Sequence, residues 1–391
     1  MSKIDINSNK LTIGFITSEY PHPKVNYAAG IATSIKNLVV SLVQKKIKVI
    51  VFVYNQDVNE IVSDKGVEIH LIKTKPYYFF GWFLSRKYIQ NYVNSIVGKE
   101  NIDILEAPDW TGITAFMRFR IPLVIRFHGS DAYFCMLDGR KQKLKNKWFE
   151  SLALKRAKAY IAPTKYAGEE TAKIFNLDRK KIKIIHYGLE IENFQNDSPK
   201  KFNENTILYI GSIIRKKGVF ELAHIFNKVI EIIPEATLVL IGNDSPDLKT
   251  GSSSTYELVE KLFSRKALTK VKYLGRIPYN DTIDHIKNAH VCTFPSFAET
   301  LGMVTIESMA LQKPVVNTSI GWAKELIDDG RNGYLVHPSD IYQYAEKVIM
   351  LLNDKNLCLQ MGKEARLKIE STFNMNMIAD KNIEYYKSII G

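Results

Sequence analysis

The sequence predicts an α/β protein with two domains, each built around a mainly parallel sheet. Strand-like apolar runs alternate with helical patterns along most of the chain. The first series opens with a strand at 11–17, a loop of small residues, an amphipathic helix and a second strand at 48–54. A second series starts again at 206–210, and 391 residues suffice for two or three domains of ordinary size.

Each predicted strand is a short apolar run bounded by glycine, proline or polar residues. In the first half these runs occupy 11–17, 48–54, 102–106, 122–127, 160–163 and 183–186. In the second half they occupy 206–210, 236–242, 271–274, 291–294, 314–316 and 333–336. Helices are expected after most of them, and three helices end the chain at 340–353, 356–370 and 375–390.

Composition indicates a folded protein that prefers anionic partners. Hydrophobic residues make up 46% of the chain and aromatic residues 11%, which excludes global disorder. Lys and Arg number 54 against 41 Asp and Glu, giving a formal net charge of +13. This excess favours nucleotide diphosphates, anionic lipid or nucleic acid. Because the sequence holds no nucleic-acid-binding motif, phosphate and lipid are preferred.

The cysteines and the amino terminus indicate a cytoplasmic protein. Cys135, Cys292 and Cys358 lie far apart and outside any Cys-x-x-Cys motif, which fits a reducing compartment and argues against a zinc site. The amino terminus lacks the apolar region of a signal peptide, and the apolar stretch 76–84 is too short to span a bilayer. We expect a cytoplasmic location or a peripheral one on the inner face of a membrane.

The segment 294–316 carries the strongest functional signal. A strand ends in a polar loop with Glu299, Gly302 opens a helix that contains Glu307, and the helix stops before Pro314. A helix start offers unpaired N–H groups to a phosphate, and Gly302 lets the backbone approach a ligand. A carboxylate can accept hydrogen bonds from two neighbouring sugar hydroxyls. Because Glu299 precedes the helix, the two acids are not predicted to act as a glycoside hydrolase pair.

This segment resembles the signature of glycosyltransferase family 4. Glu299 and Glu307 are separated by seven residues, within a frame set by Pro295, Gly302 and Pro314. Members of that family are retaining, use nucleotide sugars and have the GT-B fold. The resemblance therefore implies two Rossmann-like domains that face each other across a cleft.

The resemblance also sets the expected domain boundaries. An acceptor-binding domain is expected over residues 1–192 and a nucleotide-sugar-binding domain over 206–372. The polar segment 193–205 is the expected linker. A terminal helix within 373–391 is expected to cross back to the first domain.

The first half contributes a small-residue loop and a histidine at a strand end. The loop at Gly30 resembles the Gly-Gly-Ile loop that the family places against the donor phosphates, with Ala29 replacing one glycine; a plain helix start is the alternative. His128 follows the strand 122–127, at the sheet edge where ligands usually bind. It matches the family's His-Gly motif, which contacts the donor sugar, although a purely structural histidine remains an alternative. Asp109 and Asp131, in loops after strands, are candidate acceptor contacts.

A basic loop after the strand 206–210 is a candidate diphosphate clamp. The family usually has Gly-Arg at this point and Lys-Gly five positions later. Lys217 and Gly218 match, but Ser212 stands where the arginine is expected. Arg215 is a candidate to replace that arginine, and a solvated run of charge is the alternative reading of the loop.

The resemblance assigns roles to residues of both halves. It implies catalytic roles for His128, Glu299, Lys217 and Arg215. It implies donor contacts, including the nucleobase loop around Arg276, from Gly30, Ser212, Arg276, Ile277, Leu301, Gly302, Met303, Val304 and Glu307. The donor is expected to be a UDP-sugar or a GDP-sugar. The leaving phosphate is expected to take the acceptor proton, and the lack of an Asp-x-Asp motif predicts no metal and no other cofactor.

The predicted function is retaining transfer of a sugar from a nucleotide diphosphate to a hydroxyl of a glycan or lipid-linked acceptor. Such a reaction serves glycan, polysaccharide or glycolipid assembly. Two alternatives stay open. One is a non-hydrolysing sugar-nucleotide epimerase, which needs no acceptor. The other is a non-catalytic sugar-nucleotide-binding partner of an assembly complex, which Ser212 keeps open.

The segment 139–158 predicts a basic amphipathic helix. Leu144, Trp148 and Leu152 share one face, and lysines and an arginine supply charge around them. One hypothesis places this helix against an anionic membrane that carries the acceptor. The alternative is a solvated helix that covers the sheet.

Overall fold

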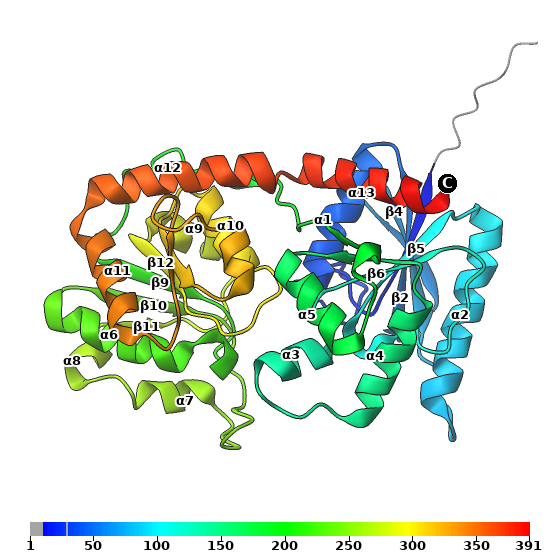
Figure 1. The fold of residues 1–391 in the computed structure, drawn as a ribbon, viewed down its shortest axis with the longest axis horizontal. Helices are drawn as coiled ribbons and strands as arrows, with labels where there is room; N and C mark the ends of the chain where they lie inside the picture. The colour runs from blue at the N-terminus through cyan, green and yellow to red at the C-terminus, as the bar shows by residue number, and fades with distance from the viewer. Residues whose placement is uncertain (1–10, 29) are drawn as a thin grey trace, which may run out of the picture. The chain divides into compact units, whose positions relative to one another are not determined.

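The alternating strands and helices form two separate parallel sheets in the computed structural model, which describes residues 11–28 and 30–391 (Figure 1). Unit 1 comprises the described residues up to 136 together with 140–188 and 375–391. Unit 2 comprises residues 137–139 and 189–374. The prediction of two α/β domains with parallel sheets is confirmed.

Unit 1 contains an eight-stranded sheet in the order β3-β4-β2-β1-β5-β6-β7-β8. All neighbouring strands are parallel except β3, which is antiparallel to β4. The strands are β1 (Thr12–Thr17), β2 (Lys48–Gln56), β3 (Glu60–Asp64), β4 (Val67–Lys73), β5 (Ile104–Pro108), β6 (Leu123–Arg126), β7 (Ala159–Ala162) and β8 (Ile182–Ile184). Every residue of β1, β5, β6 and β7 is buried, because helices cover both faces of the sheet.

The helices of unit 1 divide between these two faces. They are α1 (Gly30–Gln44), α2 (Gly81–Glu100), α3 (Asp131–Leu137), α4 (Leu144–Arg156), α5 (Lys165–Phe175) and α13 (Met375–Ile390). Apolar residues of α1 and α13 share one core with one side of the strands, and those of α2 and α4 share a second core. Figure 1 shows α13 alongside α1, so the last helix of the chain is part of unit 1.

The helix expected over 139–158 is shorter than the sequence predicted, because it begins only at Leu144. Gly139 adopts a left-handed φ of 64°, and the N–H of Arg140 bonds to the carbonyl of Cys135, which ends α3. The segment between Gly139 and Leu144 is therefore a connection and not a first helical turn.

Unit 2 contains a six-stranded parallel sheet in the order β11-β10-β9-β12-β13-β14. The strands are β9 (Thr206–Ile210), β10 (Thr237–Ile241), β11 (Val271–Tyr273), β12 (Val291–Phe294), β13 (Val315–Thr318) and β14 (Tyr334–Val336). The helices are α6 (Val219–Ile232), α7 (Thr255–Glu260), α8 (Arg265–Leu268), α9 (Tyr279–Asn288), α10 (Met303–Ala310), α11 (Ile341–Asn353) and α12 (Lys355–Thr372). Chain order runs one way from β9 and the other way from β12. The loops after these two strands therefore diverge at a topological switch point, where open α/β sheets bind ligands.

The segment 193–205, expected as a linker, packs on unit 2. Phe194 is buried, and the side-chain amide of Asn196 donates to the carbonyl of Leu311 at 2.9 Å. The rings of Phe202 and His290 lie 4.6 Å apart. These contacts fix the segment against the sheet and the helix α10.

Lys313 is buried beside this segment, with its Nζ 5.1 Å from the centre of the Phe202 ring. Burial lowers the pKa of Lys313 to about 8. Between about pH 8 and the ordinary lysine pKa, Lys313 is protonated in the unfolded chain but largely neutral in the folded one. Over this range its contribution makes the free energy of unfolding rise with pH.

Replacing Lys313 with Met should therefore stabilise the protein by up to about 3 kcal/mol at neutral pH. Urea unfolding of the two proteins at pH 7 and at about pH 9.5 tests this. The stability difference should shrink at the higher pH, and a difference that stays constant contradicts the argument. Lys363→Met, at an exposed lysine, should leave stability unchanged at both pH values.

Among the described residues, no helix combines the length and the apolar character needed to cross a membrane.

Candidate functional site

The loops after β9 and β12 lie against each other at the switch point of unit 2. Gly218 has a left-handed φ of 71°, and a Cβ built on it would lie 1.8 Å from the carbonyl oxygen of Pro295. The backbone N–H of Phe297 donates to the carbonyl of Lys216 at 2.8 Å. Only a glycine at 218 permits this approach, so the Lys-Gly pair that the sequence singled out also joins the two loops.

Lys217 and Glu299 form an ion pair across these loops, 82 residues apart in the sequence. Their side chains are 20% and 21% exposed, so both are accessible at the carboxyl edge of the sheet. The structure thus brings together two of the residues predicted to be catalytic. A cation that can neutralise a phosphate lies beside an anion that can accept from hydroxyls.

The helix α10 begins directly after Glu299. Gly302 precedes its first turn with a left-handed φ of 96°, and Leu301 is fully buried beneath it. The backbone N–H groups of Met303 and Val304 belong to the first helical turn, where no intrahelical acceptor is available. The positive end of the helix therefore lies next to the Lys217–Glu299 pair in sequence and in space.

Glu307 lies on α10 and pairs with a tyrosine of α9. The Tyr279 hydroxyl donates to its carboxylate at 2.8 Å, and the Tyr279 ring is 53% exposed. The protein packed around this half-buried carboxylate raises the pKa of Glu307 to about 7, because desolvation disfavours the charged form. The hydrogen bond from Tyr279 acts in the opposite direction.

Arg215 is held by an aspartate of the loop after β10. Its Nε and Nη2 donate to the two carboxylate oxygens of Asp247 at 2.7 and 2.9 Å, and its guanidinium lies 3.9 Å from the centre of the Phe220 ring. This fork holds the pKa of Asp247 well below its usual range. Ser212 is exposed in the same loop. The role of Arg215 in place of the expected arginine stays a prediction. In that role the guanidinium would bind a phosphate while it stays paired with Asp247.

The remaining donor residue predictions fall at two further loops. Arg276 is exposed and Ile277 half-buried after β11, next to Gly275 with its left-handed φ of 64°. Gly30 is exposed at the start of α1, and a Cβ there would meet nothing within 4 Å, so a close backbone approach is sterically open. Ala29 lies outside the described residues.

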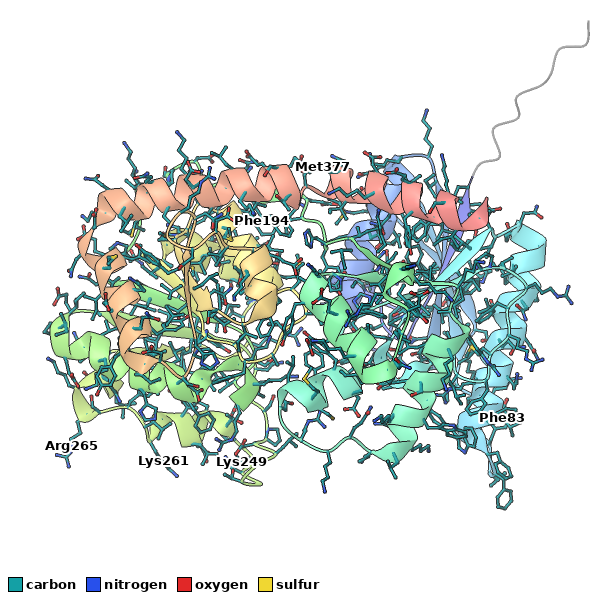
Figure 2. All side chains as sticks on the ribbon, in the orientation of Figure 1. Phe83, Phe194, Lys249, Lys261, Arg265 and Met377 are labelled. Atoms are coloured by element: carbon teal, nitrogen blue, oxygen red, sulfur yellow. The ribbon has the colours of Figure 1, made fainter. Side chains whose placement is uncertain are left out.

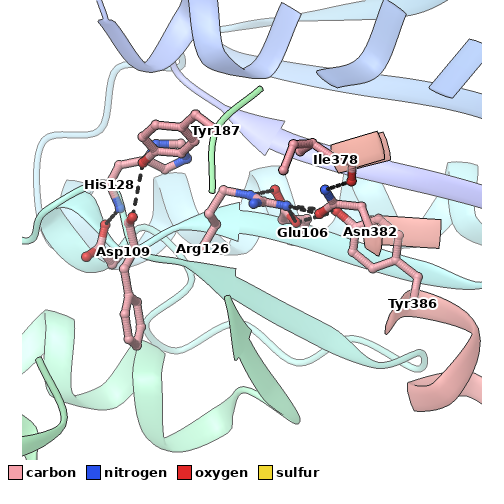
Figure 3. Close-up of polar contacts among 9 residues, drawn as sticks. Glu106, Asp109, Arg126, His128, Tyr187, Ile378, Asn382 and Tyr386 are labelled. Atoms are coloured by element: carbon pink, nitrogen blue, oxygen red, sulfur yellow. Dashed lines mark hydrogen bonds and ion pairs between the residues drawn. The ribbon is translucent and has the colours of Figure 1, made fainter. Parts of the chain in front are cut away.

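His128 follows β6 in unit 1 and contacts Tyr187 (Figure 3). Nδ1 of His128 lies 2.8 Å from the Tyr187 hydroxyl, and the two ring planes differ by 12°. Burial of the imidazole and the nearby charge of Arg126 lower the pKa of His128 to about 3. The ring is therefore neutral at physiological pH.

Asp109 lies beneath His128 and is only 1% exposed. Its Oδ1 accepts from the backbone N–H of His128 at 2.9 Å, and Oδ2 has no hydrogen-bond partner among the described residues. Burial raises the pKa of Asp109 to about 7. An acceptor sugar could not reach this carboxylate in the present conformation, so the geometry favours a positioning role over the predicted acceptor contact.

Asp131 begins α3 and is partly buried. Its carboxylate accepts from the Asn146 side chain at 3.0 Å and from Arg140 at 3.3 Å. These contacts outweigh desolvation and lower the pKa of Asp131. Its predicted role as an acceptor contact therefore requires an acceptor that competes with these two donors.

Both halves of the chain match known families. Residues 190–368 match the family described as Glycosyl transferases group 1, and residues 28–193 match Glycosyltransferase Family 4. An uncharacterized glycosyltransferase of Methanocaldococcus jannaschii is 25% identical over 395 residues, which cover 96% of this chain and 98% of that protein. The chain is a glycosyltransferase, with a family 4 domain in its first half and a group 1 domain in its second. The family that the residues around Glu299 and Glu307 indicated is thus confirmed.

The glycosyltransferase also shares its fold with solved structures. A sucrose-phosphate synthase from Thermosynechococcus elongatus superposes with a TM-score of 0.78 at 19% identity, covering 97% of this chain and 99% of that chain. HepE of Anabaena, solved in complex with UDP and glucose, has a TM-score of 0.73 at 18% identity, with coverage of 97% and 100%. At this identity the likeness shows the fold alone.

Sequence reasoning missed a buried polar network in unit 1 of the glycosyltransferase. Arg126 of β6 donates to Glu106 of β5 through Nε at 2.7 Å and Nη2 at 2.9 Å, and to the Asn382 side chain at 2.6 Å (Figure 3). The Tyr386 hydroxyl donates to the same glutamate. The network ties α13 to β6, the strand that precedes His128. The only sequence signal for this network is one charged residue in each of two otherwise apolar strands, Glu106 in β5 and Arg126 in β6.

Proposed function

We propose that this glycosyltransferase moves a sugar from a nucleoside diphosphate to an acceptor hydroxyl with retention of anomeric configuration, in glycan, polysaccharide or glycolipid assembly. The observation that carries the proposal is the Lys217–Glu299 pair beside the open amino-terminal end of α10. A Staphylococcus aureus relative named for capsular polysaccharide biosynthesis is 28% identical over 211 residues, covering 52% of this chain and 53% of that protein. That name supports the same class of product.

The donor would replace the ion pair of the free protein. The diphosphate forms an ion pair with Lys217 and accepts hydrogen bonds from the N–H groups of Met303 and Val304. The Glu299 carboxylate is then left to accept from hydroxyls of the sugar. Glu307 accepts from the ribose. This arrangement neutralises the diphosphate with protein groups, so the proposal includes no metal.

Catalysis then consists of stabilising the charge that grows on the leaving phosphate. The bond from the anomeric carbon to the phosphate oxygen breaks, the acceptor oxygen bonds to that carbon, and the acceptor proton passes to the departing phosphate. Lys217 and the helix end stabilise this phosphate more strongly as its charge increases, which lowers the barrier. The role of His128 toward the donor sugar stays a prediction, and His128→Ala should lower turnover.

A thermal-shift screen with UDP, GDP, ADP and their sugars identifies the donor, because a ligand that binds only the folded state raises the melting temperature. Product analysis with and without candidate acceptors then separates the alternatives. Conversion of the sugar nucleotide without an acceptor indicates an epimerase. Binding without turnover under every acceptor indicates a non-catalytic partner.

The pKa of Glu307 predicts how donor affinity changes with pH. With a pKa of about 7, Glu307 is largely protonated in the free protein below that pH and accepts poorly from ribose hydroxyls. Affinity for the nucleotide sugar should therefore fall below about pH 7, by at most about tenfold per unit. Calorimetric titration measures this.

Two variants make this pH prediction specific. Glu307→Gln should bind weakly and with no midpoint near neutral pH. Tyr279→Phe removes the hydrogen bond that favours the carboxylate, so it should move the midpoint upward. Wild-type affinity that is flat across this range contradicts the role given to Glu307.

The acceptor and the location belong to the same proposal. We propose that unit 1 binds a glycan or lipid-linked acceptor and that the enzyme works peripherally at the anionic inner face of a membrane. The net charge of +13 supports an anionic surface as a partner.

A further inference from the structure

The amino-terminal end of α2 exposes three consecutive aromatic side chains. Tyr78, Phe79 and Phe80 are 102%, 80% and 70% exposed. Phe80 has a left-handed φ of 52°, a conformation that an aromatic residue rarely adopts. Contiguous exposed apolar side chains of this kind mark an interaction surface, whereas single ones need no explanation.

The first turns of α4 extend this surface. The Trp82 ring lies 6.1 Å and the Phe116 ring 5.1 Å from the ring of Trp148, which packs the start of α2 against α4. Figure 2 shows Phe83 at this end of α2. We name as the α2–α4 tip the exposed residues Tyr78, Phe79, Phe80, Leu84, Leu144 and Trp148.

Cations surround the α2–α4 tip. The segments 75–87, 110–120 and 140–148 carry ten Lys and Arg side chains and no Asp or Glu. Lys145 and Lys147 are exposed on the same helix as Leu144 and Trp148, and Lys143 is exposed directly before it. Aromatic tips flanked by lysines fit the boundary of an anionic bilayer, where the rings enter the headgroup region and the ammonium groups meet phosphates. A second copy of this tip is disfavoured, because two such surfaces would repel.

We propose that the α2–α4 tip docks the protein on an anionic lipid surface, with Tyr78, Phe79 and Phe80 entering the headgroup region. This deepens the proposed function by naming the surface that brings the enzyme to a lipid-linked acceptor. Docking needs neither donor nor acceptor, so it is measured separately from sugar transfer.

Co-sedimentation with vesicles tests the docking. The full chain should bind vesicles of phosphatidylcholine with phosphatidylglycerol and bind pure phosphatidylcholine much less. Tyr78→Ser with Phe79→Ser should weaken binding at least about tenfold, and Lys143→Gln with Lys145→Gln and Lys147→Gln by a similar factor that grows at low salt.

Matched controls use equally exposed residues of unit 2. Tyr342→Ser removes an aromatic side chain that is 73% exposed, and Lys261→Gln with Arg265→Gln removes exposed charges (Figure 2). Neither should change vesicle binding. All variants should keep wild-type donor affinity, which shows that they are folded.

Three outcomes would overturn the docking proposal. They are no binding to anionic vesicles, binding that the tip variants leave unchanged, and a dimer in sedimentation equilibrium that Tyr78→Ser with Phe79→Ser dissociates. The last would assign the tip to a second copy. If no sugar nucleotide binds but vesicles do, the proposed function fails and the docking surface stands.

A second inference concerns the tautomer of His128 and rests on different contacts. The Tyr187 hydroxyl lies 3.1 Å from the carbonyl oxygen of Phe127 and 2.8 Å from Nδ1 of His128. A carbonyl can only accept, so the single hydroxyl proton points to Phe127. Nδ1 must then carry a proton and donate to Tyr187. The geometry points to Tyr187 as a positioning residue that leaves Nε2 of His128 as a hydrogen-bond acceptor for a hydroxyl.

Nitrogen NMR of ¹⁵N-histidine-labelled protein tests this directly. The His128 signals, identified by their loss in His128→Gln, should show a protonated Nδ1 and a bare Nε2. Tyr187→Phe should shift them toward the other tautomer and lower kcat at least about tenfold, with KM for the donor changing less.

Tyr385→Phe is the matched control, because this tyrosine also donates to backbone carbonyls in unit 1 without touching His128. It should leave the His128 signals unchanged. A wild-type spectrum with the proton on Nε2, or a tautomer that Tyr187→Phe does not alter, overturns the assignment.

Discussion

Lys217→Ala is expected to lower turnover about a thousandfold or more without unfolding the protein. The substitution removes the cation that lies beside the start of α10 and would stabilise the departing phosphate. Its partner Glu299 is as accessible as Lys217, and partly exposed ion pairs contribute about 1 kcal/mol or less to stability. Loss of activity should therefore come with a nearly unchanged melting temperature. Release of nucleotide from the donor in the presence of acceptor measures the effect.

Lys216→Ala is the matched control for this prediction. It lies in the same short 3-10 turn, Arg215–Lys217, and its backbone carbonyl, which holds Phe297, is kept. It should retain activity within about twofold, since the ion pair with Glu299 is made by Lys217. Glu299→Ala should be as inactive as Lys217→Ala. Full activity in either of these two variants defeats the assignment of the site.

The double variant Lys217→Ala with Glu299→Ala tests whether the pair acts as a unit. Groups that serve one transition state are strongly non-additive, so the double variant should be little worse than either single one. Losses that multiply would mean that the two residues act at independent points of the reaction.

The central strands could be predicted from sequence because each is a continuous apolar run. The runs 206–210 and 291–294 coincide with β9 and β12, which helices cover on both faces. The edge hairpin of β3 and β4 was missed, because β3 is exposed at alternate positions and its polar and apolar residues do not alternate. Its signal was the turn at Lys65 and Gly66, whose φ values of 50° and 83° fit a two-residue hairpin.

The site was predictable only where each functional residue lies in a loop that directly follows a strand. Lys217 and Glu299 each follow a strand, and neighbouring parallel strands bring their loops together. The pairing of Arg215 with Asp247 could not be foreseen, because it depends on how the loop after β10 folds back. Asp109 looked like a ligand contact from its place after β5, but its carboxylate turns inward to the backbone of His128. Strand position predicts a residue's location and not the direction of its side chain.

Arg126→Met is expected to cost about 3–5 kcal/mol of the stability of unit 1. Arg126 and Glu106 are each 3% exposed, so removing the guanidinium leaves the Glu106 carboxylate buried without its cation. The Asn382 side chain loses its hydrogen bond from Arg126 in the same step, which loosens α13. Chemical denaturation should show the loss, and hydrogen exchange should show faster exchange in α13 than in α12.

The loss of stability in Arg126→Met should come from the unpaired charge of Glu106 and not from the lost hydrogen bonds. A compensating variant separates these two causes. Arg126→Met with Glu106→Gln removes both charges, so it should recover most of the stability that Arg126→Met loses. Arg331→Met breaks an ion pair with Glu364 whose arginine is 70% exposed, and it should cost less than about 1 kcal/mol. If the double variant is no more stable than Arg126→Met, the network stabilises unit 1 through its geometry. The deep burial of two opposite charges would then be a means of orienting α13 against β6, the strand that precedes His128.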